Sequence, residues 1–314
     1  MGKQVGHKIN PINLKIGDQG IVKVRYSNYN NKIRSPKDSE LNLELLDFLE
    51  GGNYTVTLTP IVDLGSFDKN KYSPNSTSYI LNKEQDNKLV EFLIRNMGQT
   101  ILNCYQDPLI QIYAIGASHP KISDSRNSYF PCSGSRDLED CIGLDQALKN
   151  LSTCMKVCDI GGAKNLSQVF EHIYETTKSQ VIDTEKNRYN VLLVITDGII
   201  NDMSLATDSI IKCSELPISI ILLGVGGSNF LELEKFDDRL CKLTNSRGES
   251  ASRCNVQFAA LDRFKNFKEI YIRLLKQVSI QAAEYFKIQL TKEEKVISYS
   301  HQLRNDFPNA EMID

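Results

Sequence analysis

Two aspartates close apolar runs, and their carboxylates are the first candidates for chemistry in this chain. Asp197 follows the run Val191–Thr196 and precedes Gly198, and Asp63 closes the run that begins at Tyr54. An unbroken series of β-branched and Leu residues is typical of a strand buried on both faces, as in the middle of a parallel sheet. Ligands of open α/β sheets gather at the carboxyl ends of the strands. We therefore expect both carboxylates at one edge of a sheet.

A Gly-rich turn over residues 161–165 precedes a predicted helix over Leu166–Ser179. Glycine frees the backbone for a tight turn before a helix. We expect this turn to open on the same cleft as Asp63 and Asp197.

The elements that must position these residues alternate along the chain. We predict strands over 54–63, 109–115, 191–196, 218–226 and 255–260. We predict helices over 83–105, 144–154, 166–179, 203–216 (with Asp202 as N-cap), 230–236 and 267–288, and a long exposed loop over 117–137. Pro60 is awkward within the first of these strands because it cannot donate to a ladder. Alternating strands and helices predict an α/β fold, a doubly wound and mostly parallel sheet with helices on both faces.

Three regions are predicted along the chain. Residues 1–40 form a short β-hairpin, over 12–16 and 20–26, followed by a polar linker. Residues 41–290 form the main domain, and residues 291–314 form a charged tail.

Composition excludes several classes of protein. The chain has 314 residues, is 41% hydrophobic and 24% charged, and carries a net charge of −2, which gives no general attraction to nucleic acid. It has no apolar run as long as a membrane span and no signal-peptide core. The eight cysteines lack CxxC spacing, so we expect reduced thiols in a cytoplasmic protein rather than a zinc site.

Several short segments resemble, in order and approximate spacing, the C-terminal domain of copines, which is similar to von Willebrand factor A and integrin inserted domains. The segments are Phe48–Asn53, the strand into Asp63, Ile195–Met203, Leu216–Ile221, Gly224–Gly226 and Val256–Phe258. Ile9–Pro11 and Gly20–Val24 resemble the end of the C2 domain that precedes it in copines, so residues 1–40 are interpreted as a remnant of that domain.

The resemblance implies a non-enzymatic protein-interaction module from a family of calcium-dependent phospholipid-binding proteins. It implies protein partners, a cytoplasmic location, and contact with phospholipid membranes at their periphery. It also implies a partner surface at the loop edge around Asp63, Lys164 and Asp197, with Mg²⁺ or Mn²⁺ as the ion of an adhesion-type metal site.

This chain departs from the family's metal-binding pattern at several positions. The family's first loop reads Asp-x-Ser/Thr-x-Ser, whereas here Gly65 and Phe67 stand at the hydroxyl positions and Ser66 is one residue out of register. The second loop would place its Thr at Lys164 or Ala163. The Asp of the third loop is kept as Asp197.

Three readings of this site stay open from the sequence. Mg²⁺ requires six oxygens, which Asp63 and Asp197, with Ser66 as a further candidate, would supply only in part. Two facing carboxylates also repel, so the Lys164 ammonium could take the place of the cation and leave a degenerate, metal-independent site. In the third reading Lys164 points to solvent, and the aspartates cap loops and helices.

Two other functions are weighed against the interaction module. Basic residues in the first forty positions could bind anionic lipid at a membrane surface: Lys3, Lys8, Lys15, Lys23, Arg25, Lys32, Arg34 and Lys37. A scaffold resembling the copine-type ubiquitin ligases would need a zinc-binding array, and the Cys and His spacing here does not provide one. Ser66 has no nucleophile-elbow context, so hydrolase chemistry is not expected.

Overall fold

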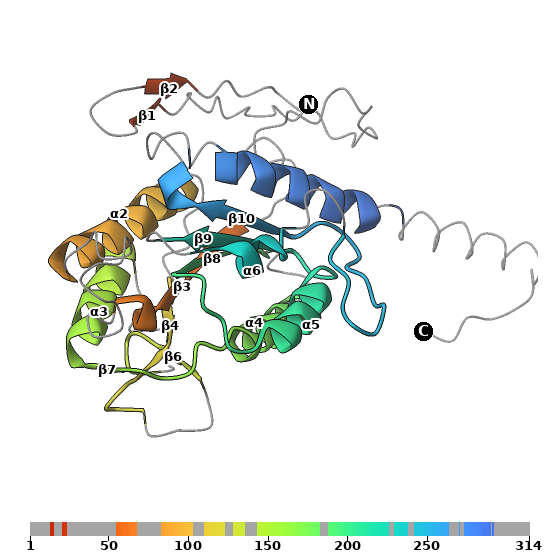
Figure 1. Ribbon diagram of the computed structural model, residues 1–314. Coiled ribbons are helices and arrows are strands. Elements are labelled where there is room, and N and C mark those ends of the chain that lie inside the picture. The colour runs from red at the N-terminus through yellow and green to blue at the C-terminus, as the bar shows by residue number, and fades with distance from the viewer. Residues whose placement is uncertain are drawn as a thin grey trace, which may run out of the picture.

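A computed structural model describes residues 13–15, 21–23, 55–67, 83–102, 110–122, 128–135, 143–182, 188–225, 229–237, 242–263, 270, 273–289 and 291. Its centre is a six-stranded sheet in the order β10-β9-β8-β3-β4-β6 (Figure 1). The strands are β3 (Thr55–Asp63), β4 (Tyr113–Ile115), β6 (Tyr129–Pro131), β8 (Arg188–Thr196), β9 (Ile218–Gly224) and β10 (Val256–Ala260). All neighbouring pairs are parallel except β4 with β6. The predicted doubly wound α/β fold is confirmed.

Helices cover both faces of the sheet (Figure 1). They are α2 (Lys83–Leu102), α3 (Leu144–Val157), α4 (Ser167–Ile182), α5 (Met203–Cys213) and the short α6 (Leu231–Glu234). Residues 273–289 form a further helix, and η2 (Leu64–Phe67) and η5 (Leu261–Arg263) are 3-10 turns. Among the helices of the described residues, none is long and apolar enough to cross a membrane.

Strand β8 shows how the sequence pattern builds two cores. Its side chains point alternately to the two faces. Val191, Leu193 and Ile195 pack into one apolar cluster with α2, α3 and the helix over 273–289. Leu192 and Val194 pack into the other with α4, α5 and α6. Because both faces are covered, the run is apolar without interruption.

The β-strands differ from the prediction in two places. Strand β4 is three residues long, shorter than the predicted strand over 109–115. The segment 117–137 is not simply an exposed loop, because β6 lies within it and pairs antiparallel with β4, and Phe130 is buried. The Ser-, Pro- and Asp-rich residues around β6 hid this short strand. The segment 117–137 also contains β5 (Ala117–Ser118), which pairs with β7 (Asp159–Ile160).

Pro60 lies within β3 and pairs with Leu193 of β8. Pairing of β3 with β4 begins only at Ile61, so the described sheet has a strand on just one side of Pro60. Pro60 has no N–H to donate, and a strand tolerates this on a side where it has no neighbouring strand.

The predicted N-terminal hairpin is present as β1 (Asn13–Lys15) and β2 (Ile21–Lys23), which pair antiparallel. The rest of residues 1–40, the predicted short element over 43–49, and the tail beyond 291 lie outside the described residues. The domain boundaries therefore stay predictions.

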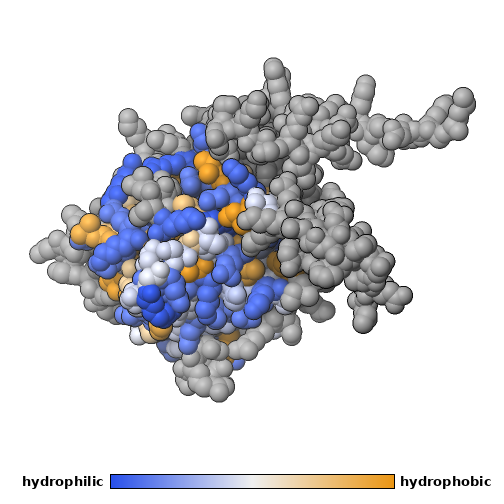
Figure 2. Space-filling view, turned by 90° about the vertical axis from the view of Figure 1, so that its right-hand side faces the viewer, coloured by the Kyte–Doolittle hydropathy of each residue, from blue (hydrophilic) through white to orange (hydrophobic). Residues whose placement is uncertain are grey.

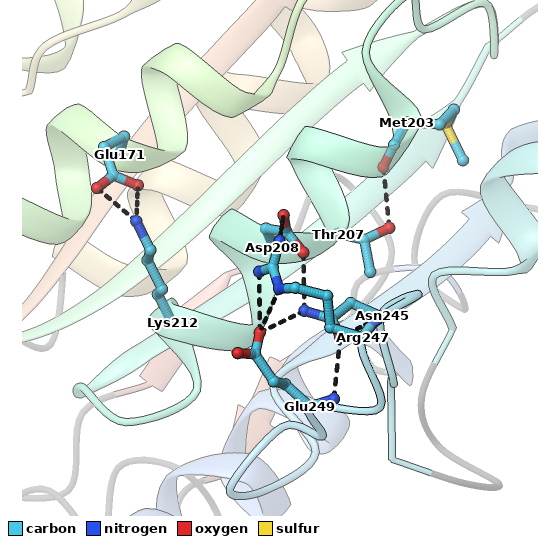
Figure 3. Close-up of polar contacts among 8 residues, drawn as sticks. All are labelled: Glu171, Met203, Thr207, Asp208, Lys212, Asn245, Arg247 and Glu249. Carbon is cyan, nitrogen blue, oxygen red and sulfur yellow. Dashed lines mark hydrogen bonds and ion pairs between the residues drawn. The ribbon is translucent and has the colours of Figure 1, made fainter.

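Ion pairs at the surface connect helix α5 with helix α4 and with the loop that precedes β10. Lys212 of α5 contacts Glu171 of α4 at 2.8 Å. Arg247, in the loop that precedes β10, contacts Asp208 of α5 at 3.2 Å and Glu249 at 2.9 Å (Figure 3). The face in Figure 2 is mostly hydrophilic, with small separate apolar areas.

Candidate functional site

The two predicted carboxylates lie side by side at the carboxyl edge of the sheet. Asp63 is the last residue of β3, and Asp197 directly follows β8. The two strands are neighbours, with Val62 opposite Ile195. Asp63 is fully buried and Asp197 is 4% exposed. The parallel pairing thus brings together two acids that are 134 positions apart.

The Lys164 ammonium lies between these carboxylates. Its Nζ is 2.8 Å from Asp63 Oδ2 and 2.8 Å from Asp197 Oδ1. Lys164 is 4% exposed, so its side chain points into the protein and not to solvent. The sequence left three interpretations of this site open. This geometry agrees with the one in which the Lys164 ammonium lies where a cation would otherwise bind.

Two hydroxyls bond to one carboxylate oxygen of Asp63. Its Oδ2 accepts hydrogen bonds from Ser66 Oγ at 2.7 Å and Thr196 Oγ1 at 2.8 Å. Ser66 Oγ also accepts from the Asp197 backbone N–H at 2.9 Å. Ser66, out of register in sequence, therefore links the two acidic loops. Thr196 was not identified from the sequence, although its place at the end of β8, next to Asp197, was the available signal.

The loop that carries Lys164 is held from two sides. Gly161 and Gly162 donate backbone N–H groups to Gly116 O at 3.1 and 3.2 Å. The Lys164 N–H donates to Asn201 Oδ1 at 2.7 Å, and the Asn201 N–H donates to Lys164 O at 3.0 Å. Asn201 was not identified from the sequence, because its contact with Lys164 forms only in the folded chain.

Asp202 is the N-cap residue of α5, as predicted, and its carbonyl oxygen accepts the Ala206 N–H at 2.8 Å. Its side chain makes no capping hydrogen bond to that helix. Instead its Oδ1 accepts from Leu166 N–H and its Oδ2 from Ser167 N–H, both at 2.9 Å. The carboxylate of Asp202 thus satisfies backbone donors at the start of α4, directly after the Lys164 loop.

Gly65 leaves the space that the lysine fills. A Cβ placed on Gly65 would lie 2.7 Å from Lys164 Cε and 3.2 Å from both Asp63 Oδ1 and Gly116 O. A side chain at position 65 and the observed position of Lys164 are therefore incompatible. Lys164 can occupy its observed position because residue 65 is a glycine and carries no hydroxyl side chain.

The charges of this group are strongly coupled. Burial is the largest influence on the Asp63 carboxyl and raises its pKa above the usual range, and the Asp197 carboxylate acts in the same direction against Lys164. Burial alone would lower the pKa of Lys164, but the two carboxylates outweigh it and raise that pKa. Burial thus keeps the pKa of Asp63 raised despite the neighbouring ammonium, and the two carboxylates keep Lys164 protonated at neutral pH.

The donor set in this arrangement does not fit a divalent cation. Mg²⁺ needs about six oxygen ligands in near-octahedral geometry, and a lysine ammonium contributes none. Lys164 Nζ contacts both carboxylates, which would otherwise be candidate metal ligands. Within the part of the chain that the structure describes, no group of three or more His, Cys, Asp or Glu side chains is placed to hold a metal ion. Asp63 Oδ1 is buried and has no hydrogen-bond partner.

Comparison with known proteins gives one family match and several solved structures that are similar to this chain. The sequence pattern of the copine family matches residues 78–294. Proximal thread matrix protein 1 from the mussel byssus is similar in structure at 12% identity and a TM-score of 0.42, over 73% of this chain and 48% of that one. This chain thus spans about half the length of the mussel protein. Manganese-loaded TRAP protein of Plasmodium vivax is similar at 15% identity and a TM-score of 0.40, over 71% of this chain and 74% of that one.

Proposed function

The chain belongs to the copine family, and from this premise we propose that it is a non-enzymatic protein-interaction module with a degenerate, metal-independent adhesion-type site. The observation that carries the proposal is the Lys164 ammonium, 2.8 Å from both Asp63 and Asp197. The edge formed by these three residues is the proposed partner-binding edge. The partners are proteins, and the proposed location is the cytoplasm.

The energetics of the buried group favour the lysine over a metal ion. To enter between Asp63 and Asp197, a divalent cation would have to displace an ammonium that already has two carboxylate partners. The ammonium and the cation thus compete for the same two carboxylates, so the lysine lowers the affinity of this edge for a metal ion. The cation would also lose waters of hydration and gain few oxygen ligands in return. We infer that partner binding at this edge does not depend on Mg²⁺ or Mn²⁺.

Calorimetric titration with MgCl₂ and MnCl₂ tests this proposal. We expect no binding to the natural chain at concentrations up to about 1 mM, the weak end of protein–metal affinities. A Lys164→Ser variant, in which the ammonium is replaced by a hydroxyl, should bind Mn²⁺ more tightly than the natural chain. Micromolar binding to the natural chain that disappears in Asp63→Ala would contradict the proposal.

Membrane association is the second candidate function, through the basic N-terminal residues and the proposed C2 remnant. Of those basic residues, the structure describes Lys15 and Lys23, on the paired strands β1 and β2. Sedimentation with phosphatidylserine vesicles, with and without calcium, distinguishes the two functions. An interaction module stays in the supernatant under both conditions. Binding through the basic residues would bring the chain down with and without calcium, whereas a calcium-dependent family activity would bring it down only with calcium.

A further inference from the structure

Two cysteine thiols meet at the carboxyl end of helix α3. Cys154 Sγ lies 3.4 Å from Cys158 Sγ, and Cys154 also hydrogen-bonds with the thiol of Cys132. Cys154 is fully buried and Cys132 is 4% exposed, whereas Cys158 is only partly buried. None of these thiols belongs to the lysine-bridged site.

The backbone holds Cys154 and Cys158 at a separation that a disulfide can span. Cys158 is the C-cap of α3, and its N–H donates to Cys154 O at 3.0 Å, so the pair keeps the i, i+4 spacing of an α-helix. That spacing places the two Cα atoms about 6 Å apart, within the range of about 4.4–6.8 Å that disulfides span. The two Sγ atoms, now 3.4 Å apart, need to approach by only about 1.4 Å to bond.

The two thiols differ in their access to solvent, and this difference assigns them separate roles. A reagent in solution must reach a thiol before it can react with it. Cys158 has exposed surface and Cys154 has none. Cys158 is therefore the thiol that reacts first with an external reagent, and Cys154 is the thiol that reacts second.

Hydrogen bonds among the thiols keep the resting pair reduced. The hydrogen bond with Cys132 is the main influence that raises the pKa of Cys154, and the hydrogen bond with Cys154 raises the pKa of Cys158. Because the thiolate is the nucleophile, these protonated thiols react slowly at neutral pH. Their oxidation therefore needs an excess of oxidant, and the second step is then favoured by the adjacent thiol.

We propose that Cys154 and Cys158 are a modification site, a dithiol that a low-molecular-weight disulfide such as oxidised glutathione converts to an intrachain disulfide. The Cys158 thiolate attacks one sulfur of oxidised glutathione, which forms a mixed disulfide and releases one reduced glutathione. The Cys154 thiolate then attacks Cys158 Sγ, which forms the Cys154–Cys158 bond and releases the second. The dithiol loses two electrons, oxidised glutathione gains them, and the two thiol protons end on the released glutathione molecules.

This modification site lies directly before the loop that carries Lys164. Cys158 is followed by β7, which pairs with β5, and then by Gly161 and Gly162, which donate to Gly116 O. The new bond would fix the end of α3 from which this loop starts. The inference does not rest on the metal-independent edge, so each stands if the other fails.

Peptide mapping tests the inference on the full natural chain. The reduced chain is incubated with oxidised glutathione at about pH 8, where more of the thiols are ionised than at neutral pH. The remaining thiols are alkylated with iodoacetamide, and tryptic peptides are identified by mass spectrometry. Trypsin cuts after Lys149, Lys156 and Lys164, so Cys154 and Cys158 fall on separate peptides, 150–156 and 157–164. We expect these two peptides to appear as a covalently linked pair.

Variants separate the two roles. In Cys154→Ser, glutathione should stay on Cys158, because no second thiol displaces it. In Cys158→Ser, loss of the Cys154 thiol should be at least about tenfold slower than in the natural chain, since burial blocks access. Cys254→Ser is the matched control, because Cys254 is also a partly buried free cysteine, and it should give the same linked pair as the natural chain. Circular dichroism verifies that each variant is folded, and the result for the natural chain does not depend on them.

Several results would overturn the inference. One is that Cys154 and Cys158 of the natural chain are both still alkylated, and thus reduced, after overnight incubation. Another is a link from Cys154 to the tryptic peptide 127–136, which carries Cys132. A third is glutathione that persists on Cys158 of the natural chain, because Cys154 would then be unable to displace it.

Discussion

A lysine ammonium and a magnesium ion neutralise carboxylates in different ways. The ion coordinates about six oxygens and accepts new ligands by exchanging water, whereas the ammonium has three donors on a tethered chain. Lys164 directs two of its contacts at Asp63 and Asp197, and both acids remain buried. The lysine therefore supplies charge but offers no exchangeable coordination position, which is the physical reason that we propose an interaction edge without ion dependence.

Replacement of Lys164 by methionine should destabilise the fold strongly. The substitution keeps the length of the side chain but leaves two buried carboxylates facing each other, so we expect a loss of roughly 3–5 kcal/mol in the free energy of unfolding. Urea unfolding at pH 7 measures it. Lys212→Met is the matched control, because its ion pair with Glu171 is about half exposed and should be worth less than about 1 kcal/mol. Equal losses in the two variants would contradict the structural role of Lys164.

The stability that Lys164 provides should disappear at alkaline pH. Its carboxylate neighbours raise its pKa above the ordinary value of 10.5, so the folded state holds the proton more tightly than the unfolded state. The resulting stabilisation is complete below pH 10.5 and decreases as pH rises through the folded-state pKa. The difference in unfolding free energy between the natural chain and Lys164→Met should therefore narrow above this pH. If this difference in unfolding free energy stayed constant up to pH 12, the ammonium of Lys164 would not be the source of the stabilisation.

Gly65 and Lys164 should behave as one unit. Gly65→Ser places a side chain against Lys164 Cε and should cost roughly 1–3 kcal/mol, as overpacking does. Gly65→Ser combined with Lys164→Ser removes that contact, so its cost should be smaller than the sum of the single variants by about 1 kcal/mol or more. A double-mutant cycle from urea unfolding gives this coupling. If the stability losses of the two single variants simply added up in the double variant, Lys164 could move aside without loss of stability.

At the scale of elements, the loop after β8 holds the loop that carries Lys164. Asn201 exchanges two hydrogen bonds with the Lys164 backbone, and Asp202 satisfies two N–H groups at the start of α4. The lysine is thus fixed by its backbone as well as by its ion pairs. The edge of the sheet is one cross-linked unit built from β3, β8 and the loop before α4.

Asp202→Ala should destabilise the fold by about 1–2 kcal/mol, the usual cost of removing a capping carboxylate. Asp145→Ala serves as the control, since Asp145 lies in the first turn of α3 with its side chain 88% exposed and its ion pair with Arg95 at the surface. We expect that control to change stability by less than about 0.5 kcal/mol. Thermal unfolding followed by circular dichroism measures both. A loss in Asp202→Ala no greater than in Asp145→Ala would contradict the capping of α4.

Sequence patterns predicted the elements that rest on long apolar periodicity and not those that rest on a few residues. Strand β8 and helix α2 follow such patterns, and their positions agree closely with the structure. Strand β6 has three residues between polar flanks, so its contribution to the sheet depends on pairing with β4. Likewise, Asp202 is the N-cap residue of α5, but its carboxylate caps α4, a relation that only the tertiary arrangement creates.

The same limit applies to the site. Asp63 and Asp197 were identifiable because each ends an apolar strand, and parallel strands bring such ends together. Lys164 was identifiable only as a substitution in a family pattern. Thr196 had only its place at the end of β8, next to Asp197, as a signal. Asn201 had none, because its contact with Lys164 joins segments that are far apart in the chain.

At the scale of the whole molecule, the described residues form a mostly parallel six-stranded sheet, and the lysine-bridged site lies at one edge of it. Two apolar clusters fill the two faces of the sheet. A sheet of this kind tolerates changes in its loops because the strands are fixed by burial on both faces. The edge could thus exchange a metal ion for a lysine while the scaffold stayed the same.

The measurement that tests the central claim most directly is a crystal structure of the natural chain soaked in MnCl₂, with anomalous diffraction recorded at the manganese edge. The account predicts no anomalous peak between Asp63 and Asp197, and Lys164 Nζ in contact with both carboxylates. A manganese peak between the two carboxylates, with the Lys164 side chain displaced, would contradict it and show that the edge binds a divalent cation after all.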